Sequence, residues 1–579
     1  MTALSIILLN LCPNRVAAQE MTINVDSVGQ LAQFLPDSVR YSMTHLKVTG
    51  PLGGNDLRLI KMIASNTRSR KATDVMLQEL DLTDATISES RGSFRTKADA
   101  LPAAMFQGCK YLTRVVLPSS ITEVARSCFN GCTALQEVVI PDNVRTIGDY
   151  AFNGCVNLSQ IRLPDGLTAI ENHAFDGCLA LTSIEIPDGV TLIDEAAFMN
   201  CKNLERIPLH ECQITSVARQ TFAGCERLSS LDLPQTVTTI GTDAFKGCIA
   251  LESIQMPEAI SKIDNGAFEN CASLRSIEMT AATIIGSDAF KGCLSLQSVD
   301  IERVNRMGSS AFEGCTGLCS VMLDGNLQAV PNECFANCTS LVTMALPSSV
   351  KTIGTRAFTD CKSLTDIQLP DGLSRIGDHA FEGCASLRYI VVPSMVRQLG
   401  NDTFESCTSL DSVVIKGFVE KLESDLFRYC HSLRVVELPI SVKSIGDNVF
   451  EQCSSLTSIT LPISITSIGD NAFEKCASLR SIIIPAACQN IGSAAFRECS
   501  ALTSVELPAA IRKIGGNAFA KCVSLSEIRI GAPLPPNISH STFKGVVLAA
   551  CRVLVPRGAK NNYRNDRSWN KMPNIVELQ

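Results

Sequence analysis

Cysteine is the residue type in this chain whose abundance and spacing could carry chemistry. The sequence has 579 residues and 26 cysteines. Nineteen of the cysteines recur from Cys109 to Cys522 at intervals of 22 to 24 residues, and each follows a phenylalanine by three residues. Thiols in such numbers could form disulfides or hold zinc.

The spacing favours packing over each of these uses. Structural zinc sites take cysteines that are only a few residues apart, whereas the recurring cysteines are about 23 residues apart. Their odd number and the parallel direction of side chains in stacked repeats count against disulfides between neighbours, which distance alone would allow. Reduced cysteine behaves as a small buried hydrophobic group. We therefore predict reduced thiols packed beside phenylalanine rings, with no metal and no cofactor, and disulfides between neighbours as the alternative.

Other residue types with catalytic or binding chemistry show no pattern. The six histidines lack a second ligand-type residue at a metal-binding spacing, and no nucleophile elbow, Walker loop or H-E-x-x-H motif occurs. The net charge of −7 gives no basic footprint for nucleic acid. No run of 18 apolar residues is present, so the mature chain is predicted to have no transmembrane segment. The sequence therefore predicts a protein that is not an enzyme.

The thiols belong to a repeat that covers most of the chain. Its phenylalanines run from Phe106 to Phe519, with a degenerate copy at Phe543. After each cysteine comes the pattern L-x-x-I-x-L, whose period of two predicts a short strand, and in most repeats a proline ends this strand. An Ile-Gly pair usually follows, and we expect its glycine to allow a tight turn. The next segment, G-x-x-A-F-x-x-C, predicts a 3₁₀ turn or a single α-turn.

One such coil cannot bury its apolar residues alone. Stacked coils bury leucine, isoleucine, phenylalanine and cysteine between neighbours, and their strands pair in parallel about 4.8 Å apart. The predicted fold is an α/β solenoid of about 20 coils of 22–24 residues, with a parallel β-sheet on one side and short 3₁₀ or helical turns elsewhere.

The consensus L-x-x-I-x-L-P-x-x-V-x-x-I-G-x-x-A-F-x-x-C-x-x-L, repeated over residues 101–545, resembles the BspA-like (Treponema-type) leucine-rich repeat of bacterial surface proteins. The resemblance implies a curved leucine-rich-repeat solenoid whose parallel sheet lines the concave side. It also implies a surface protein with protein ligands, such as host extracellular-matrix proteins, plasma proteins or other cells.

The first residues of the chain are interpreted as a secretory signal peptide, residues 1–18. An apolar run from Ala3 to Leu11 precedes the small residues that end at Ala18, although no basic residue comes before the run. We therefore predict export to the cell surface or the extracellular space, with the periplasm as the alternative.

The segments that flank the repeat are predicted to cover its two ends, as solenoids require for solubility. Residues 19–100 are predicted to form an N-terminal cap with atypical leucine-rich coils. This cap should contain a helix in LAQFLP, a strand, turn and helix in HLKVTGPLGGNDLRLIKMIA, and a strand in LQELDLTDATI. Residues 546–579 are predicted to form a C-terminal cap in which Tyr563 and Trp569 cover the last coil.

A ligand is expected to bind the concave side of the sheet. The residue between the isoleucine and the final leucine of L-x-x-I-x-L should point outward there, and these residues are acidic in the middle of the array and apolar further on. One coil departs from the repeat and has Phe418 where a regular coil has its loop. The predicted ligand-binding residues are Glu185, Asp232, Gln255, Glu278, Asp300, Met322, Val391 and Val414.

The sequence thus predicts a non-enzymatic, exported binding protein of the adhesin type. The concave face would recognise a protein partner, with residues 185–325 as the favoured region. Two alternatives stay open: an envelope component that captures nutrients, glycans or peptides, and a structural surface spacer without a specific ligand.

Overall fold

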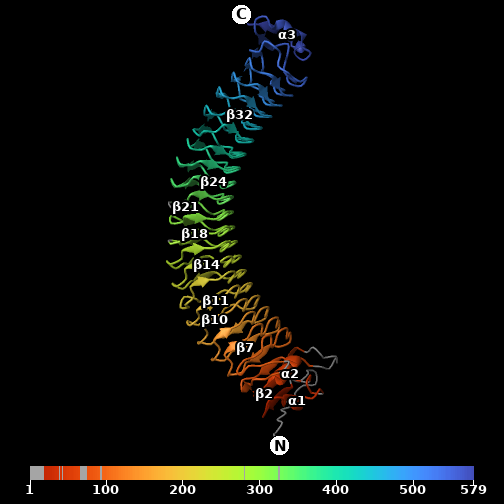
Figure 1. Ribbon diagram of the computed structural model, residues 1–579, viewed down its shortest axis with the longest axis vertical. Helices are drawn as coiled ribbons and strands as arrows, with labels where there is room; N and C mark the ends of the chain where they lie inside the picture. The colour runs from red at the N-terminus through yellow and green to blue at the C-terminus, as the bar shows by residue number, and fades with distance from the viewer. Residues whose placement is uncertain are drawn as a thin grey trace. The chain divides into compact units, whose positions relative to one another are not determined.

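The computed structural model describes residues 19–578 except for positions 38, 42, 66–74, 92–93, 280 and 324–325. The chain divides into two compact units, a first unit that ends at Ala282 and a second unit that begins at Thr283. Each unit is a stack of coils (Figure 1). The predicted signal peptide at residues 1–18 lies outside the described residues.

The first unit begins with the segments predicted at residues 19–100. The structure confirms the helix expected in LAQFLP, the strand, turn and helix expected in HLKVTGPLGGNDLRLIKMIA, and strand structure in LQELDLTDATI. The strand β1 was not predicted. β1 pairs in parallel with β2, which pairs in turn with β3 and β4. These elements are β1 (Glu20–Asn24), α1 (Leu31–Phe34), β2 (His45–Leu52), α2 (Gly54–Ser65), β3 (Glu79–Asp81) and β4 (Ala85–Ile87).

Two rows of short strands run through the rest of the first unit. The predicted row comes from L-x-x-I-x-L and consists of β5 (Arg114–Val116), β7 (Glu137–Val139), β9 (Gln160–Ile161), β13 (Ser230–Asp232), β15 (Ser253–Gln255) and β17 (Ser276–Ile277). A second row, which was not predicted, comes from the residues at the Ile-Gly pair. It consists of β6 (Glu123–Val124), β8 (Thr146–Ile147), β10 (Ala169–Ile170), β11 (Leu192–Ile193), β12 (Ser216–Val217), β14 (Thr239–Ile240) and β16 (Lys262–Ile263).

The second unit has the same two rows. The first row consists of β19 (Ser298–Asp300), β21 (Ser320–Met322), β23 (Thr343–Ala345), β25 (Asp366–Gln368), β27 (Tyr389–Val392), β29 (Ser412–Ile415), β31 (Val435–Glu437), β34 (Ser481–Ile483), β36 (Ser504–Leu507) and β38 (Glu527–Ile530). The second row consists of β18 (Ile284–Ile285), β20 (Arg306–Met307), β22 (Ala329–Val330), β24 (Thr352–Ile353), β26 (Arg375–Ile376), β28 (Gln398–Leu399), β30 (Lys421–Leu422), β32 (Ser444–Ile445), β33 (Ser467–Ile468), β35 (Asn490–Ile491) and β37 (Lys513–Ile514).

The strand pairs described within each unit are parallel, and those of the two rows join equivalent residues of successive coils. Val115 lies opposite Val138 in the first unit, and Ile390 lies opposite Val413 in the second. The predicted solenoid of stacked coils with parallel strands and little helix is therefore confirmed.

The second unit ends with four further elements. Trp569 is fully buried, its indole Nε1 donates to the carbonyl oxygen of Pro536 at 2.9 Å, and its ring meets Phe543 edge-on at 5.8 Å. The Tyr563 hydroxyl, also buried, donates to the carbonyl oxygen of Ala532 at 2.8 Å. The boundaries predicted for the two caps stay a prediction. The elements are β39 (Arg552–Val555), α3 (Lys560–Asn565), the 3₁₀ helix η1 (Trp569–Lys571) and β40 (Ile575–Glu577).

The recurring phenylalanines form a continuous stack inside each unit. Neighbouring ring centroids are 5.1–5.8 Å apart in the first unit and 5.0–5.6 Å apart in the second. From Phe106 to Phe519 no more than 1% of any of these residues is exposed. Between the ends of each stack, every ring therefore lies between the rings of the two adjacent coils.

The segment around each phenylalanine departs from the helical turn expected there. The amide of Phe152 donates to the carbonyl oxygen of Ala174 in the next coil at 2.7 Å, whereas the amide of Cys155 donates back to Phe152 at 3.1 Å. Tyr150 and Gly154 both have positive φ, at 56° and 69°. These left-handed residues interrupt the right-handed backbone, so no continuous helix forms around the phenylalanine. The expected turns are present as separate i→i+3 hydrogen bonds, and every second amide joins the next coil instead.

Glycine is required after the isoleucine for a different reason from the tight turn that was predicted. Gly377 and Gly469 are not in the left-handed region of φ. A Cβ on Gly377 would lie 2.6 Å from the backbone nitrogen of Thr355, and a Cβ on Gly469 would lie 2.5 Å from a backbone carbon of Gly446. Glycine is therefore required by the close approach of successive coils rather than by a turn.

The recurring thiols have hydrogen-bond partners of their own. Cys155 Sγ donates to the carbonyl oxygen of Phe129 at 3.1 Å, and Cys384 Sγ donates to that of Phe358 at 3.2 Å, each one coil earlier. Burial raises the pKa of the Cys155 thiol to about 12 and that of Cys384 well above its ordinary value. Each of these contacts uses the S–H group as the donor, and a disulfide would remove that donor. Every described cysteine is a free thiol, and among them Cys319 alone is exposed.

We expect thiol reactivity to follow this burial. In the folded protein, iodoacetamide should alkylate Cys319 quickly and the recurring cysteines many times more slowly, because the thiolate reacts and burial disfavours it. In concentrated urea all of them should react alike. Mass spectrometry of peptides alkylated under non-reducing conditions measures both states. Disulfide-linked peptides that contain two recurring cysteines, or native alkylation of those cysteines as fast as that of Cys319, would contradict the account.

Candidate functional site

The residues predicted to bind a ligand all lie on the exposed side of the first strand row, or at its ends. In the first unit the side chains of Asp232 and Gln255 are exposed and lie opposite each other in register. Glu278 is also exposed, one coil further on. Glu185 is exposed too, but the coil that carries Pro208 at this position separates it from Asp232. The first unit therefore brings together only part of the predicted acidic set.

In the second unit the structure brings two predicted pairs together. Asp300 lies opposite Met322, which is half exposed, and Val391 lies opposite Val414. Both valines are half-buried. The acidic positions predicted within residues 185–325 therefore give way to the hydrophobic Met322 in the second unit. The apolar pair Val391 and Val414 lies further along the same unit.

The apolar pair is part of a larger surface that the sequence did not reveal. Tyr389 is 48% exposed and lies two residues before Val391 on β27, while Val435 on β31 and Met395 after β27 are equally exposed. Residues of β27, β29 and β31 pair one to one, so Tyr389, Ser412 and Val435 form one line and Val391, Val414 and Glu437 form the next. We call this surface the Tyr389 face; it consists of Tyr389, Val391, Met395, Val414 and Val435.

The strands beneath the Tyr389 face are longer than most of the others. β27 and β29 each have four residues and are rich in valine and isoleucine, which favour extended backbone. Alternate residues such as Ile390 and Val413 are buried in the core, which fixes the direction of the exposed ones. The exposed tyrosine and valines are thus held on a rigid platform.

A hollow and a charged border complete the Tyr389 face. The hollow has a volume of about 650 Å³ and lies against Asp366, Gln368, Tyr389 and Met395. On the other border Arg434 is paired with Asp411 at 3.7 Å. Exposed aromatic and apolar side chains surrounded by polar ones are typical of protein-recognition surfaces.

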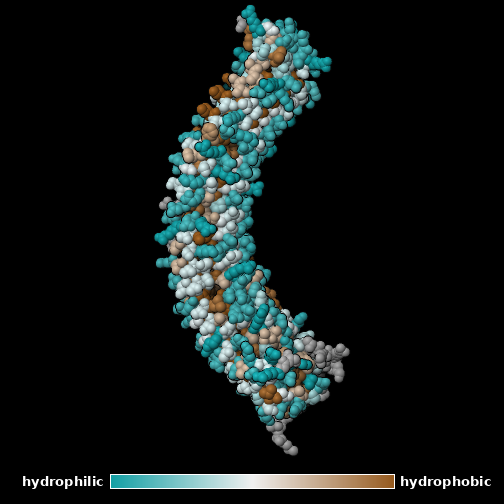
Figure 2. Space-filling view, in the orientation of Figure 1, coloured by the Kyte–Doolittle hydropathy of each residue, from teal (hydrophilic) through white to brown (hydrophobic). Residues whose placement is uncertain are grey.

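Exposed isoleucines continue this apolar character along the next coils. Ile440 follows Pro439, Ile463 follows Pro462, and Ile483 lies on β34. They are 84%, 81% and 68% exposed. Figure 2 shows apolar side chains gathered on the coils around β32.

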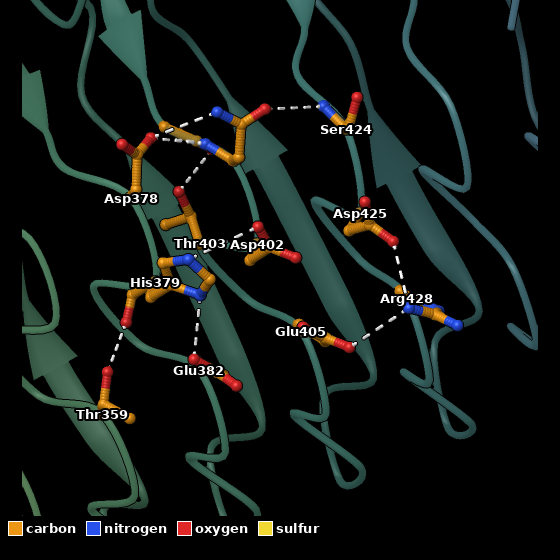
Figure 3. A network of polar contacts seen from close by, with 12 residues as sticks. Thr359, Asp378, His379, Glu382, Asp402, Thr403, Glu405, Ser424, Asp425 and Arg428 are labelled. Carbon is orange, nitrogen blue, oxygen red and sulfur yellow. Dashed lines mark hydrogen bonds and ion pairs between the residues drawn. The ribbon is translucent and has the colours of Figure 1, made fainter.

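A network of charged side chains lies in the turn segments of the second unit (Figure 3). His379 Nδ1 is 2.9 Å from Glu382 and its Nε2 is 3.6 Å from Asp402. Arg428 contacts three carboxylates, those of Asp425 at 3.3 Å, Glu405 at 3.8 Å and Glu451 at 2.9 Å. Carboxylates therefore outnumber cations in this network.

Burial raises the pKa of Glu405 to about 7, and a hydrogen bond with Asp402 and the charges of Asp402 and Glu382 add to the shift, whereas Arg428 opposes it. Burial and the charge of Asp402 also raise the pKa of Asp425. Although the network is rich in carboxylates, no group of three or more histidine, cysteine, aspartate or glutamate residues in the described part of the chain is arranged to hold a metal ion.

This network should make stability depend on pH. Because the folded pKa of Glu405 is raised, its contribution to stability is present below its ordinary pKa and is lost as the pH rises through about 7. Substitution Glu405→Gln removes the charge, so its thermal midpoint should fall less between pH 5 and pH 8 than that of the wild type. Thermal unfolding followed by circular dichroism at each pH measures the difference.

The exposed Glu437 on β31 supplies the matched control, because Glu437→Gln should keep the pH dependence of the wild type. A Glu405→Gln profile that runs parallel to the wild-type profile would show that the raised pKa does not affect folding.

Comparison with known proteins identifies the repeat. The family model described as "BspA type Leucine rich repeat region (6 copies)" matches residues 99–226, 193–319, 328–452 and 420–548. No match was found among curated proteins. No helix in the described parts of residues 19–578 is both long and apolar enough to cross a bilayer.

Several solved structures are similar to the chain. A leucine-rich repeat protein from Bacteroides ovatus is 27% identical, with a TM-score of 0.52, and the match covers 69% of this chain and 92% of that one. A leucine rich cell surface protein from Faecalibacterium prausnitzii is 24% identical over 60% of this chain and 87% of that one, with a TM-score of 0.32. The pneumococcal vaccine antigen PcpA is 17% identical over 72% and 93%, with a TM-score of 0.35. The family model covers well over half of the sequence, and the chain therefore belongs to the BspA-type leucine-rich repeat family.

Proposed function

We propose that the protein is an exported surface protein of the adhesin type and that its Tyr389 face binds a protein ligand. The observation that carries the proposal is the Tyr389 face itself, a rigid row of paired strands that exposes a tyrosine, a methionine and valines inside a polar border. Tyrosine anchors contribute much of the binding energy in protein interfaces at a small entropic cost.

Membership of the family supports the surface setting. A solved structure similar to the chain is described as a leucine rich cell surface protein from Faecalibacterium prausnitzii. Export would use the segment interpreted as a signal peptide, residues 1–18. The ligands proposed are host extracellular-matrix or plasma proteins, or proteins of other cells.

The acidic positions give the proposal a second, electrostatic part. Asp232 and Glu278 of the first unit are exposed and lie two coils apart at the same position of the repeat. Their negative charges would attract a basic partner, and this attraction should weaken as the salt concentration rises. Asp300 would act in the same way within the second unit.

The Tyr389 face can be tested with immobilised serum and extracellular-matrix proteins. For each protein that the wild type retains, Tyr389→Ala and Val435→Ser should each weaken the affinity by at least tenfold, because the variant loses an aromatic or apolar anchor that the bound partner would cover. Surface plasmon resonance measures the affinities. Val342→Ser is the matched control, because Val342 is as exposed as Val435 but lies outside the face; it should bind like the wild type.

Three other results would contradict the proposal. Retention that Tyr389→Ala leaves unchanged would exclude the Tyr389 face, and the loss of retention only in the variant with Asp232→Lys and Glu278→Lys would transfer recognition to the acidic positions of the first unit. If no protein is retained, the protein is a spacer or an envelope component that captures small ligands.

A further inference from the structure

A second hollow of the second unit lies where one coil departs from the repeat. A regular coil has proline after its first strand, but the coil of β29 has Lys416, followed by Gly417 and Phe418. A Cβ on Gly417 would lie 2.5 Å from the carbonyl oxygen of Val396, so the glycine lets this corner lie tightly against the preceding coil. Phe418 is 53% exposed and borders a hollow of about 560 Å³, which we call the Phe418 hollow.

Two arginines of the Phe418 hollow have no acidic partner. The Arg397 guanidinium lies over the Phe418 ring, 5.8 Å from its centroid, and Arg375 lines the hollow from β26. Among the described residues neither guanidinium has a carboxylate within ion-pair distance, and both side chains are exposed. A guanidinium that stacks on an aromatic ring still directs its N–H groups outward, where they match a planar anion.

The carboxylates that line the same hollow are already engaged. Glu420 accepts a hydrogen bond from Lys443 at 2.7 Å, and Glu423 is paired with Lys421. Asp378 accepts a hydrogen bond from the backbone amide of Asn401 at 2.9 Å. Of these three carboxylates both glutamates are paired with lysines, and Asp378 is bonded to a neutral amide. The two unpaired arginines thus outnumber the one carboxylate that has no cationic partner, and the ligand that complements this excess is an anion.

The rim of the hollow is held in place before any ligand arrives. Asp378 binds the amide of Asn401, and the Asn401 side-chain oxygen accepts a hydrogen bond from the amide of Ser424 at 3.2 Å. Figure 3 shows this line of contacts running from Asp378 to Ser424 across three successive coils. A preformed rim keeps the entropic cost of binding low.

The backbone of the hollow is paired on the side of β26 and forms only a short sheet edge between β28 and β30. Arg375 and Ile376 pair with Gln398 and Leu399 of the next coil. The amides of Gly377 and Gly400 donate to carbonyl oxygens of the coils before them, at 2.9 and 3.0 Å. β28 is the last strand of its sheet and β30 is the first strand of the next sheet, and both line the hollow. Each has only two residues, so a peptide bound as an added strand would find few backbone partners at this edge, and we assign recognition to the side chains.

The side chains present fit a sugar ring. The exposed part of the Phe418 ring can receive the C–H groups of a pyranose, because an aromatic face carries partial negative charge. The side-chain amide of Gln398 lies in the same hollow and can exchange hydrogen bonds with hydroxyl groups. Its volume is in the range of small-ligand sites.

We infer that the Phe418 hollow binds an acidic saccharide, with a sugar ring on Phe418 and its carboxylate or sulfate held by Arg397 and Arg375. This site is separate from the Tyr389 face, and its ligand is a glycan rather than a protein.

The full chain can be titrated with fluorescent oligogalacturonate, which carries carboxylates, with dextran sulfate, with neutral dextran and with poly-glutamate. The wild type should bind oligogalacturonate, and Arg397→Ala and Phe418→Ser should each weaken that affinity at least tenfold. Serine occupies the position equivalent to Phe418 two residues after Pro439, so Phe418→Ser should leave the fold intact. Thermal midpoints measured on each variant check this.

Arg512→Ala is the matched control, because Arg512 has the position of Arg397 in a later coil that lacks an exposed aromatic residue; its affinity should not change. Tyr389→Ala should also leave saccharide binding unchanged, so this test and that of the Tyr389 face can fail separately. Tighter binding of dextran sulfate than of oligogalacturonate also supports the inference and assigns the anion as sulfate. Equal binding of poly-glutamate, no change in Phe418→Ser, or no binding of either acidic saccharide would overturn it.

Discussion

The structure depends on the stacking of one phenylalanine ring and one thiol per coil against the equivalent groups of the next coil. A ring that lies between the rings of its neighbours loses much of its burial when those neighbours are absent, so a coil is stable only inside the stack. Loss of one such ring would leave a cavity that costs about 3–5 kcal/mol. The thiol adds a hydrogen bond to the phenylalanine carbonyl of the preceding coil, as Cys384 does with Phe358 at 3.2 Å.

The same stacking determines where binding chemistry can arise. Because equivalent residues of successive coils lie in register, each surface position of the repeat becomes a column along the unit. Most columns carry small or charged residues that water solvates. The Tyr389 face and the Phe418 hollow are places where neighbouring columns carry aromatic, aliphatic or unpaired cationic side chains at the same coils, and both belong to the second unit.

Much of the fold could be predicted because the repeat is regular. The alternation in L-x-x-I-x-L predicted the strands, and the spacing of Phe and Cys predicted their burial. The interleaved hydrogen bonds around each phenylalanine were not predicted, because residues as different as Tyr150 and Ala494 adopt the same positive φ two residues before the ring, and that position has no signature in residue type. For the candidate site, the sequence analysis selected ligand-binding residues only from the column that contains Val391. Tyr389 and Val435 lie in the adjacent column, so they were missed.

The central claim is that the chain is built of interchangeable coils held by neighbour contacts, and deletion of one coil tests it most directly. Removal of residues 451–473 takes out one repeat and joins Phe450 to Glu474 in register, whereas removal of residues 451–462 takes out about half a repeat. Hydrogen exchange followed by mass spectrometry should show native protection on both sides of the full-repeat deletion and lost protection around the half-repeat deletion. Equal effects of the two deletions would contradict the account.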